Sequence, residues 1–172
     1  CSPGAGPKVR CFFKMSEFIA RCRERRRTVS REELRSVLVD SVRRHLVADV
    51  PVGVFLSADI DSGAVAALAS ESHSRLVAVT LGFPEYQGTP ADEVPGAMKT
   101  AERYGLCHQT IWLSPAEVDL SEVLGAMDQP SIDGVNTYLV SQAAVSAGLK
   151  VALSGLGGDE LFGGYNTFRR VP

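Results

Sequence analysis

Short apolar runs alternate with helical patterns between residues 52 and 153, and this alternation constrains the fold more than any other feature. The first run, residues 52–57, reads Val-Gly-Val-Phe-Leu-Ser and lacks polar alternation, which is typical of a strand buried on both faces. We expect the elements after it to be a helix at 61–70, a strand at 76–81, a helix at 92–104, a strand at 108–113, a helix at 114–127, a helix ending at Gly148 and a strand at 149–153. This alternation predicts an α/β fold, a parallel sheet covered by helices with right-handed crossovers.

A further helix is predicted ahead of the first strand. Ser30 and Glu33 have the spacing of a capping box, in which each side chain bonds a backbone N–H of the other residue. Apolar residues then recur at helical intervals, at Leu34, Val37, Leu38, Val42 and Leu46. Pro51 is expected to end this helix, because the residue before a proline is pushed toward extended geometry.

The first 29 residues differ in composition from the rest. They begin Pro- and Gly-rich, and the stretch from Arg21 to Arg27 carries five arginines. We interpret residues 1–29 as a leader, which can be disordered, and residues 30–172 as the folded domain. The arginines could contact phosphate or RNA, but without interleaved aromatic residues a solvated surface is the favoured interpretation. We therefore expect the leader to contribute nothing to a ligand site.

The overall composition favours a globular protein that binds small molecules. The net charge of the 172 residues is −2, which gives no general case for a nucleic-acid or membrane partner. No apolar run approaches the roughly 18–20 residues needed to cross a bilayer. Four cysteines occur, none in a C-x-x-C pair, and we interpret them as reduced thiols of a cytoplasmic protein.

Small residues and carboxylates gather directly after two of the predicted strands. Residues 57–63 read Ser-Ala-Asp-Ile-Asp-Ser-Gly, and residues 154–160 read Ser-Gly-Leu-Gly-Gly-Asp-Glu. In open parallel sheets, ligands bind outside the carboxyl ends of the strands. Backbone N–H groups at the start of the first helix, together with two serine hydroxyls, can face a pyrophosphate. Asp61 and Asp159 would repel phosphate unless a Mg²⁺ ion bridges them. The two loops together predict a magnesium–nucleotide site.

Both loops resemble motifs of a known family. The first is similar to the pyrophosphate loop of ATP pyrophosphatases, usually S-G-G-x-D-S-S, which alone leaves GMP synthetase, NAD synthetase and tRNA-thiolating enzymes open. Residues 153–165 resemble the asparagine-synthetase pattern S-G-x-G-x-D-E-x-F-G-G-Y, and residues 128–138 resemble a segment of bacterial members. The resemblance covers residues 39–172 and points to the glutamine-hydrolysing asparagine synthetase family. It implies the adenine nucleotide alpha hydrolase-like (ATP pyrophosphatase) fold, incomplete at its C-terminal end.

The resemblance also implies roles for individual residues. The matching nucleotide-binding positions are Leu56, Ser57, Ser62, Gly63, Leu81, Ser154 and Gly155. The matching catalytic positions are Asp61, Asp159 and Glu160. Of these three carboxylates, Asp61 and Asp159 would be linked to Mg²⁺.

By the same resemblance, the expected reaction uses ATP to activate aspartate as an acyl-adenylate, releases pyrophosphate, and continues with amidation by ammonia. The ammonia would come from a glutaminase domain that is not part of this chain, since the residues after Cys1 do not resemble a glutaminase start. A homodimer of the full-length protein is also implied. Two alternatives stay open: a related carboxylate-activating synthetase, β-lactam-forming or peptide-cyclising, and a nucleotide-binding remnant without catalysis.

The sequence departs from the family at four positions in the loops. The exchanges at Ala58 and Gly63 are small-for-small and are expected to matter less than those at Asp59 and Leu156. Asp59 stands where the family has glycine, so we expect backbone strain of about 1–3 kcal/mol there and a charge that faces the phosphates. We expect Asp59 to weaken ATP binding. Leu156 stands where some relatives carry a glutamate near the reacting substrate. The catalytic role of that glutamate therefore cannot be carried over to this chain.

Overall fold

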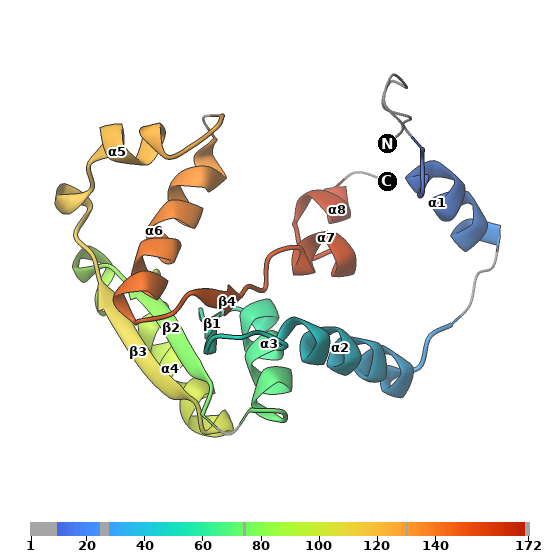
Figure 1. Ribbon diagram of the computed structural model, residues 1–172, viewed down its shortest axis with the longest axis horizontal. Helices are drawn as coiled ribbons and strands as arrows, with labels where there is room; N and C mark the ends of the chain where they lie inside the picture. Colours follow the sequence, from blue (N-terminus) through green and yellow to red (C-terminus); the bar gives the residue numbers. More distant parts are fainter. Residues whose placement is uncertain (1–9, 25–27, 74, 130, 171–172) are drawn as a thin grey trace, which may run out of the picture. The chain divides into compact units, whose positions relative to one another are not determined.

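The computed structural model describes residues 10–24, 28–73, 75–129 and 131–170 (Figure 1). The chain divides into two compact units, Cys1–Arg35 and Ser36–Pro172. The first unit contains α1 (Met15–Glu24), in which no residue is buried. None of the helices in the described part of the chain is long and apolar enough to span a membrane.

The helix α2 (Arg31–His45) begins at the predicted capping box. The Ser30 hydroxyl accepts from the Glu33 N–H at 3.1 Å, and the Glu33 carboxylate accepts from the Ser30 N–H at 3.2 Å. The prediction that Pro51 ends this helix is wrong, because α2 stops at His45. The chain leaves the helix early, and Leu46, only 5% exposed, packs into the core just before the chain runs into the first strand.

Four parallel strands form one sheet in the order β3-β2-β1-β4. They are β1 (Val52–Phe55), β2 (Val77–Gly82), β3 (Cys107–Trp112) and β4 (Val151–Leu153). Gly53 pairs with Val77 on one side of β1, and Val52 pairs with Val151 on the other. The predicted parallel α/β sheet is confirmed, and each strand lies within about two residues of its expected position.

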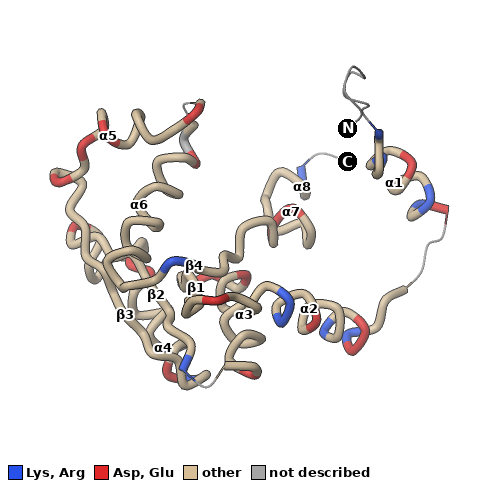
Figure 2. Tube along the Cα trace, viewed as in Figure 1, with Lys and Arg blue, Asp and Glu red and all other residues tan. Residues whose placement is uncertain are grey.

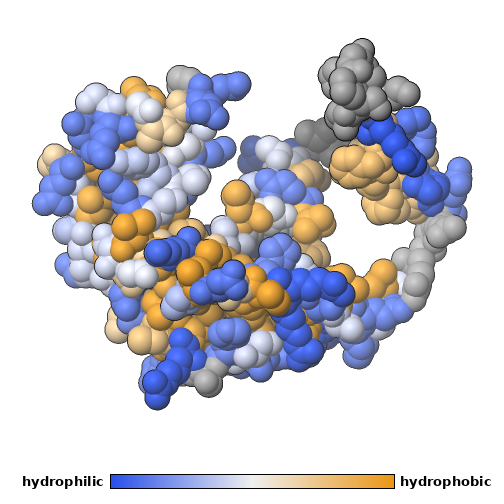
Figure 3. Space-filling model, viewed as in Figure 1, coloured by the Kyte–Doolittle hydropathy of each residue, from blue (hydrophilic) through white to orange (hydrophobic). Residues whose placement is uncertain are grey.

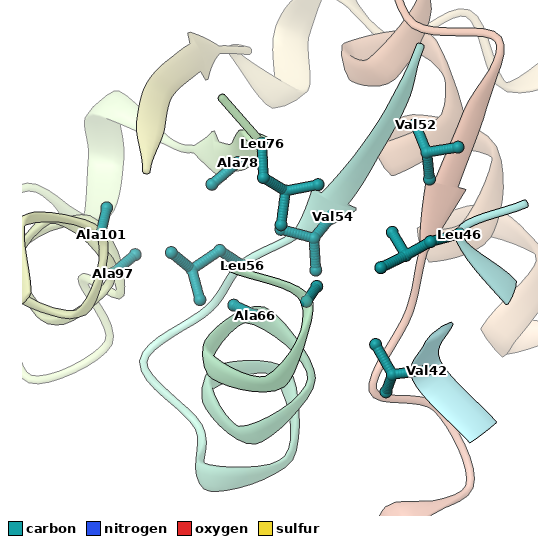
Figure 4. Packing of buried hydrophobic residues seen from close by; sticks show 11 residues of the cluster. Val42, Leu46, Val52, Val54, Leu56, Ala66, Leu76, Ala78, Ala97 and Ala101 are labelled. Atoms are coloured by element: carbon teal, nitrogen blue, oxygen red, sulfur yellow. The ribbon is translucent and has the colours of Figure 1, made fainter. Parts of the chain in front are cut away.

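Helices cover both faces of this sheet. Those of the second unit after α2 are α3 (Ile60–Ser70), α4 (Val94–Tyr104), α5 (Leu120–Gly125), α6 (Ile132–Ser146), α7 (Gly158–Phe162) and α8 (Thr167–Arg170). On one face, Val54 of β1 packs with Ala66 of α3 and Ala97 of α4 (Figure 4). On the other face, Val79 of β2 packs with Ala143 of α6. Alternate side chains of each strand therefore enter opposite cores, as a doubly covered sheet requires.

Two predicted helix boundaries in this unit are wrong. The helix expected at 114–127 is divided into a 3₁₀ turn, Pro115–Glu117, and α5. A new helix starts at Leu120 because the Asp119 carboxylate accepts from the Ser121 N–H at 2.8 Å and caps it. The helix expected to end at Gly148 ends at Ser146, and it begins at Ile132, where the Ser131 hydroxyl accepts from the Gly134 N–H at 2.8 Å.

A buried hydroxyl joins the ends of three strands. Thr80 is 2% exposed, and its hydroxyl donates to the Leu56 carbonyl at 2.7 Å. The hydroxyl oxygen lies 2.8 Å from Nε2 of His108. Because the single hydroxyl hydrogen is already used, Nε2 of His108 must be the donor. Partial burial lowers the pKa of His108, which favours the neutral ring with its hydrogen on Nε2. His108 is therefore a structural hydrogen-bonding residue.

We expect Thr80→Val to lower the free energy of unfolding by about 1–3 kcal/mol, because it leaves the Leu56 carbonyl and His108 without their buried partner. Urea unfolding followed by the fluorescence of Trp112 measures this loss. Thr80→Ser keeps the hydroxyl and is expected to lose less than half as much. A Thr80→Val variant as stable as the unchanged chain would show that the hydroxyl does not hold these strands.

Candidate nucleotide-binding site

A cavity of about 860 Å³ opens at the carboxyl edge of the sheet. Its walls are the loop between β1 and α3, the end of β2, and the loop and helix that follow β4. Nine of the ten site positions predicted from the sequence line it, namely Leu56, Ser57, Asp61, Ser62, Leu81, Ser154, Gly155, Asp159 and Glu160. The structure places Gly63 differently, since a side chain at this position would meet Thr100 of α4 at 3.7 Å.

The loop after β1 is folded around one serine. Ser62 is 8% exposed, and its hydroxyl accepts from the Ser57 N–H at 3.1 Å and donates to the Asp59 carbonyl at 3.2 Å. The hydroxyls of Ser57 and Ser62 lie 2.7 Å apart. Ser62 therefore braces the loop from within, and the Ser57 hydroxyl belongs to the same network, because it also accepts from the Asp59 N–H at 3.3 Å.

The start of α3 offers backbone donors to the cavity. The Gly63 N–H donates to the Asp59 carbonyl at 3.1 Å and is the first in the helical pattern. Among the described residues, no partner is recorded for the N–H groups of the three residues before it, 60–62, as is usual for the first turn of a helix. Such free N–H groups at the positive end of a helix favour an anion, and phosphate above all.

The loop after β4 lies against this same helix start. A methyl group on Gly155 would lie 2.7 Å from the Ser62 nitrogen and 2.9 Å from the Asp61 carbonyl carbon. A methyl group on Gly158 would overlap the Asp61 carboxylate. Glycine is needed at position 155 because backbone meets backbone there, whereas at position 158 the Asp61 side chain would have to move. The two motifs, nearly a hundred residues apart in sequence, thus form one wall of the cavity.

Several carboxylates lie near one another where the loop after β1 contacts the loop after β4. Partial burial raises the pKa of Asp159, and the negative charges of Asp61, Glu160 and Asp59 raise it further. Neighbouring like charges are unfavourable unless a cation lies between them. Glu160, the third member of the predicted catalytic set, accepts from the Tyr165 hydroxyl at 2.9 Å. This bond and the charge of Glu160 raise the pKa of Tyr165.

These residues fit a magnesium ion that the substrate helps to hold. Among the described residues there is no group of three or more His, Cys, Asp or Glu side chains able to enclose a metal. Magnesium is usually held by one or two carboxylates together with substrate phosphates and water. Asp61 and Asp159 supply those two carboxylates, and the helix start beside them suits the phosphates. Their roles as metal ligands stay a prediction.

Backbone groups at the end of β2 complete the cavity. The Leu56 N–H donates to the Val79 carbonyl at 2.9 Å, after which β1 turns away while β2 continues to Gly82. Alternate residues of a parallel strand direct both backbone groups to the same neighbour. Leu81 therefore turns its N–H and C=O toward the side that β1 has left, whereas the Gly82 carbonyl accepts from the Leu113 N–H of the β3 side at 2.9 Å. A neighbouring donor and acceptor suit the amino group and ring nitrogen of adenine.

The structure corrects the expectation about Asp59. Its φ of −79° and ψ of 156° are extended geometry, which any residue adopts without strain. No residue other than glycine has a positive φ in the described part of the chain. The predicted backbone strain is therefore wrong, and only the charge of Asp59 remains as a penalty. That charge is felt locally, because burial first and then Asp59 raise the pKa of Glu93.

We expect Asp59→Asn to tighten Mg-ATP binding about two- to fivefold, since one like charge near a solvated ligand costs about 0.5–1 kcal/mol. The same change is expected to lower the pKa of Glu93, which NMR titration can follow. Calorimetric titration compares the affinities, with Asp59→Glu as the control that keeps the charge. Weaker binding by the asparagine form would show that Asp59 helps to hold the metal.

Sequence reasoning missed part of the cavity wall. Glu93, at the start of α4, and Asn136, on α6, both line the cavity. Gly96 of α4 is also involved, because a methyl group there would lie 2.7 Å from the Cβ of Ala58 in the first loop. The start of α4 follows β2, so the rule that ligands lie at the carboxyl ends of strands could have indicated Glu93. Asn136 lies within residues 128–138, so their resemblance to a segment of bacterial members could have indicated it.

The fold and the site define an α/β protein in which the loops after β1 and β4 line one candidate nucleotide-binding cavity. A solved structure, the U34-tRNA thiolase NcsA from Methanococcus maripaludis with its [4Fe-4S] cluster, shares the fold with a TM-score of 0.53 at 18% identity, over 74% of this chain and 47% of that one. This likeness fits the adenine nucleotide alpha hydrolase-like fold that the sequence predicts. The family model for asparagine synthase matches residues 33–172, and the chain belongs to that family.

Curated relatives agree with this assignment. Asparagine synthetase (glutamine-hydrolyzing) 1 of Bacillus subtilis is 40% identical over 142 residues, which are 80% of this chain and 22% of that protein. Asparagine synthetase B (glutamine-hydrolyzing) of Escherichia coli is 31% identical over 162 residues, 83% of this chain and 28% of that protein. The chain therefore spans about a quarter of the length of these relatives.

Proposed function

We propose that this chain is the ATP-binding part of a magnesium-dependent ligase that activates aspartate and amidates it. The observation that carries the proposal is the convergence of two loops on one cavity, where Gly155 lies against the start of α3 and the Asp61 carboxylate lies beside Gly158. Membership of the asparagine synthase family supports the amidating reaction. We also propose a cytoplasmic location, glutamine as the source of the ammonia, and a homodimer for the full-length protein.

In this proposal each wall of the cavity holds one part of ATP. The backbone of Leu81 binds the edge of adenine, and Leu56 and Gly155 flank the nucleoside. The N–H groups at the start of α3 and the Ser57 hydroxyl bind the pyrophosphate. Asp61 and Asp159 would hold Mg²⁺, which supplies charge neutralisation for the leaving pyrophosphate. Groups arranged in advance around a developing charge stabilise it more than water does.

The reaction then proceeds in two displacements. A carboxylate oxygen of aspartate attacks the α-phosphorus of ATP, and the bond to the pyrophosphate oxygen breaks. Ammonia attacks the activated carbonyl carbon, AMP leaves with the bridging oxygen, and the nitrogen loses a proton to give the amide. The residues of this chain contribute chiefly to the first displacement, because they surround the position proposed for the pyrophosphate.

One observation favours a second candidate, a nucleotide-binding remnant without catalysis. The described residues that line the cavity include six carboxylates, at positions 59, 61, 92, 93, 159 and 160, and no Lys or Arg. A pyrophosphate leaving group normally gains from basic side chains as well as from metal. The remnant predicts Mg-ATP binding without turnover.

Two measurements separate these candidates. Calorimetric titration with Mg-ATP tests the cavity directly, and exchange of labelled pyrophosphate into ATP in the presence of aspartate tests the activation step. Binding together with aspartate-stimulated exchange supports the proposal. Exchange stimulated by another carboxylate instead indicates a related synthetase, and binding without exchange in the full-length protein indicates the remnant. Absence of Mg-ATP binding overturns both candidates.

A further inference from the structure

The apolar side chains of α1 lie along one side of the helix and are exposed. At about 100° per residue, Met15, Phe18, Ile19 and Cys22 fall within an arc of about 100°. Phe18 and Ile19 are 46% and 44% exposed, and Phe12, just before the helix, is 96% exposed. In the space-filling view apolar residues lie beside hydrophilic ones in the part of the chain that holds α1 (Figure 3). An apolar face this exposed on a short helix requires something to cover it.

Basic and acidic residues both occur along α1 (Figure 2). On the helical wheel Arg21 and Arg23 border the apolar arc, one on each side. Glu17 and Glu24 fall on the opposite side, and Glu17 is paired with Lys14 at 2.8 Å. A surface that meets the apolar arc therefore also meets the arginines and avoids the glutamates.

Although the net charge of the whole chain is small, its basic and acidic residues are concentrated in different segments. Residues 1–29 contain eight Lys and Arg against two Glu, whereas residues 30–172 contain ten Lys and Arg against eighteen Asp and Glu. The expectation that a net charge of −2 gives no case for a charged partner therefore does not hold for this segment. A second copy of α1 would not cover the arc well, because it would bring two strongly basic segments together.

We propose that α1 docks in the plane of a membrane surface that carries anionic lipids. Exposed Phe and Ile side chains suit insertion at the boundary between headgroups and acyl chains, and flanking arginines suit lipid phosphates. Clusters of Lys and Arg on or beside an amphipathic helix are attracted to the negative potential of the cytoplasmic leaflet. The segment lies on the surface and does not span the bilayer. This role is independent of the nucleotide cavity.

Sedimentation of the full chain with lipid vesicles tests this proposal. We expect the chain to bind phosphatidylcholine vesicles that contain phosphatidylserine, and to bind vesicles of phosphatidylcholine alone at least tenfold less. Arg21→Gln with Arg23→Gln is expected to weaken binding roughly 20-fold, at about fivefold for each basic residue near the surface. Phe18→Ser with Ile19→Ser should weaken it by at least as much. Glu24→Gln, on the opposite side of α1, is the matched control and should bind as well as the unchanged chain.

Urea unfolding followed by Trp112 of β3 verifies that the variants keep the second unit folded. Equal binding to both kinds of vesicle would overturn the proposal, since it would remove the role of charge. Binding that survives loss of Phe18 and Ile19 would overturn it as well, because the apolar arc would then be unused. No binding to either vesicle, or a dimer that only the Phe18→Ser, Ile19→Ser variant breaks, would assign the arc to a protein surface instead.

Discussion

Replacing Gly155 by alanine is expected to weaken Mg-ATP binding by about 100-fold and to lower the free energy of unfolding by about 1–3 kcal/mol. The added methyl group would lie 2.7 Å from the Ser62 nitrogen and 2.9 Å from the Asp61 carbonyl carbon. Both of these neighbours are backbone atoms, which cannot move aside by a change of rotamer. The two loops must therefore separate, and the backbone donors at the start of α3 shift away from the pyrophosphate.

Gly63→Ala provides a matched control in α3, the helix against which Gly155 lies. Its methyl group would meet only Thr100 Cγ2, at an ordinary 3.7 Å. Since alanine is a better helix former than glycine, this variant is expected to be as stable as the unchanged chain or more stable, by up to about 1 kcal/mol. Calorimetry and urea unfolding on both variants give the comparison. If Gly155→Ala binds Mg-ATP normally, the contact between the two loops is not needed for the site.

Asp159→Asn is expected to change stability and binding in opposite directions. The pKa of Asp159 is raised by partial burial and then by Asp61, Glu160 and Asp59, so the folded chain disfavours the charged form. At neutral pH this charge therefore lowers stability, and the folded chain gains stability as the pH falls through the raised pKa. Without metal, the asparagine variant should unfold at the same urea concentration as the unchanged chain or at a higher one.

The same variant is expected to bind Mg-ATP about 100-fold more weakly or worse, since loss even of an outer-shell partner commonly costs 10- to 100-fold in metal affinity. Asp61→Asn is expected to weaken Mg-ATP binding to a similar extent. For the unchanged chain, Mg-ATP binding should weaken as the pH becomes acidic, because protons compete with the metal for Asp159. Calorimetry with and without Mg²⁺ measures these effects. If Asp159→Asn leaves the affinity for Mg-ATP intact, the metal is not held between the two loops.

The sheet and the positions of its strands could be predicted from the sequence because β1, β2 and β4 are short, mostly apolar runs that alternate with helical patterns. The rule that ligands lie at the carboxyl ends of strands also predicted that the two loops would share an edge. Two other features, the start of α5 and the backbone geometry of Asp59, could not be predicted from the sequence. The break at Asp119 follows from a side chain that caps a new helix, and a capping signal at Ser114 concealed it. The extended backbone of Asp59 could not be predicted from a family in which glycine occupies that place.

The pairing of β1 with β4 has a consequence for how the site forms during folding. Val52 pairs with Val151, so strands about a hundred residues apart in sequence must meet before the two loops touch. Pairing of such distant segments is slow because a long loop must be closed first. The chain emerging from the ribosome therefore carries the loop after β1 long before its partner exists. A nucleotide that needs both loops cannot guide the early steps of folding. Added ATP should slow unfolding of the finished domain and leave its folding rate almost unchanged.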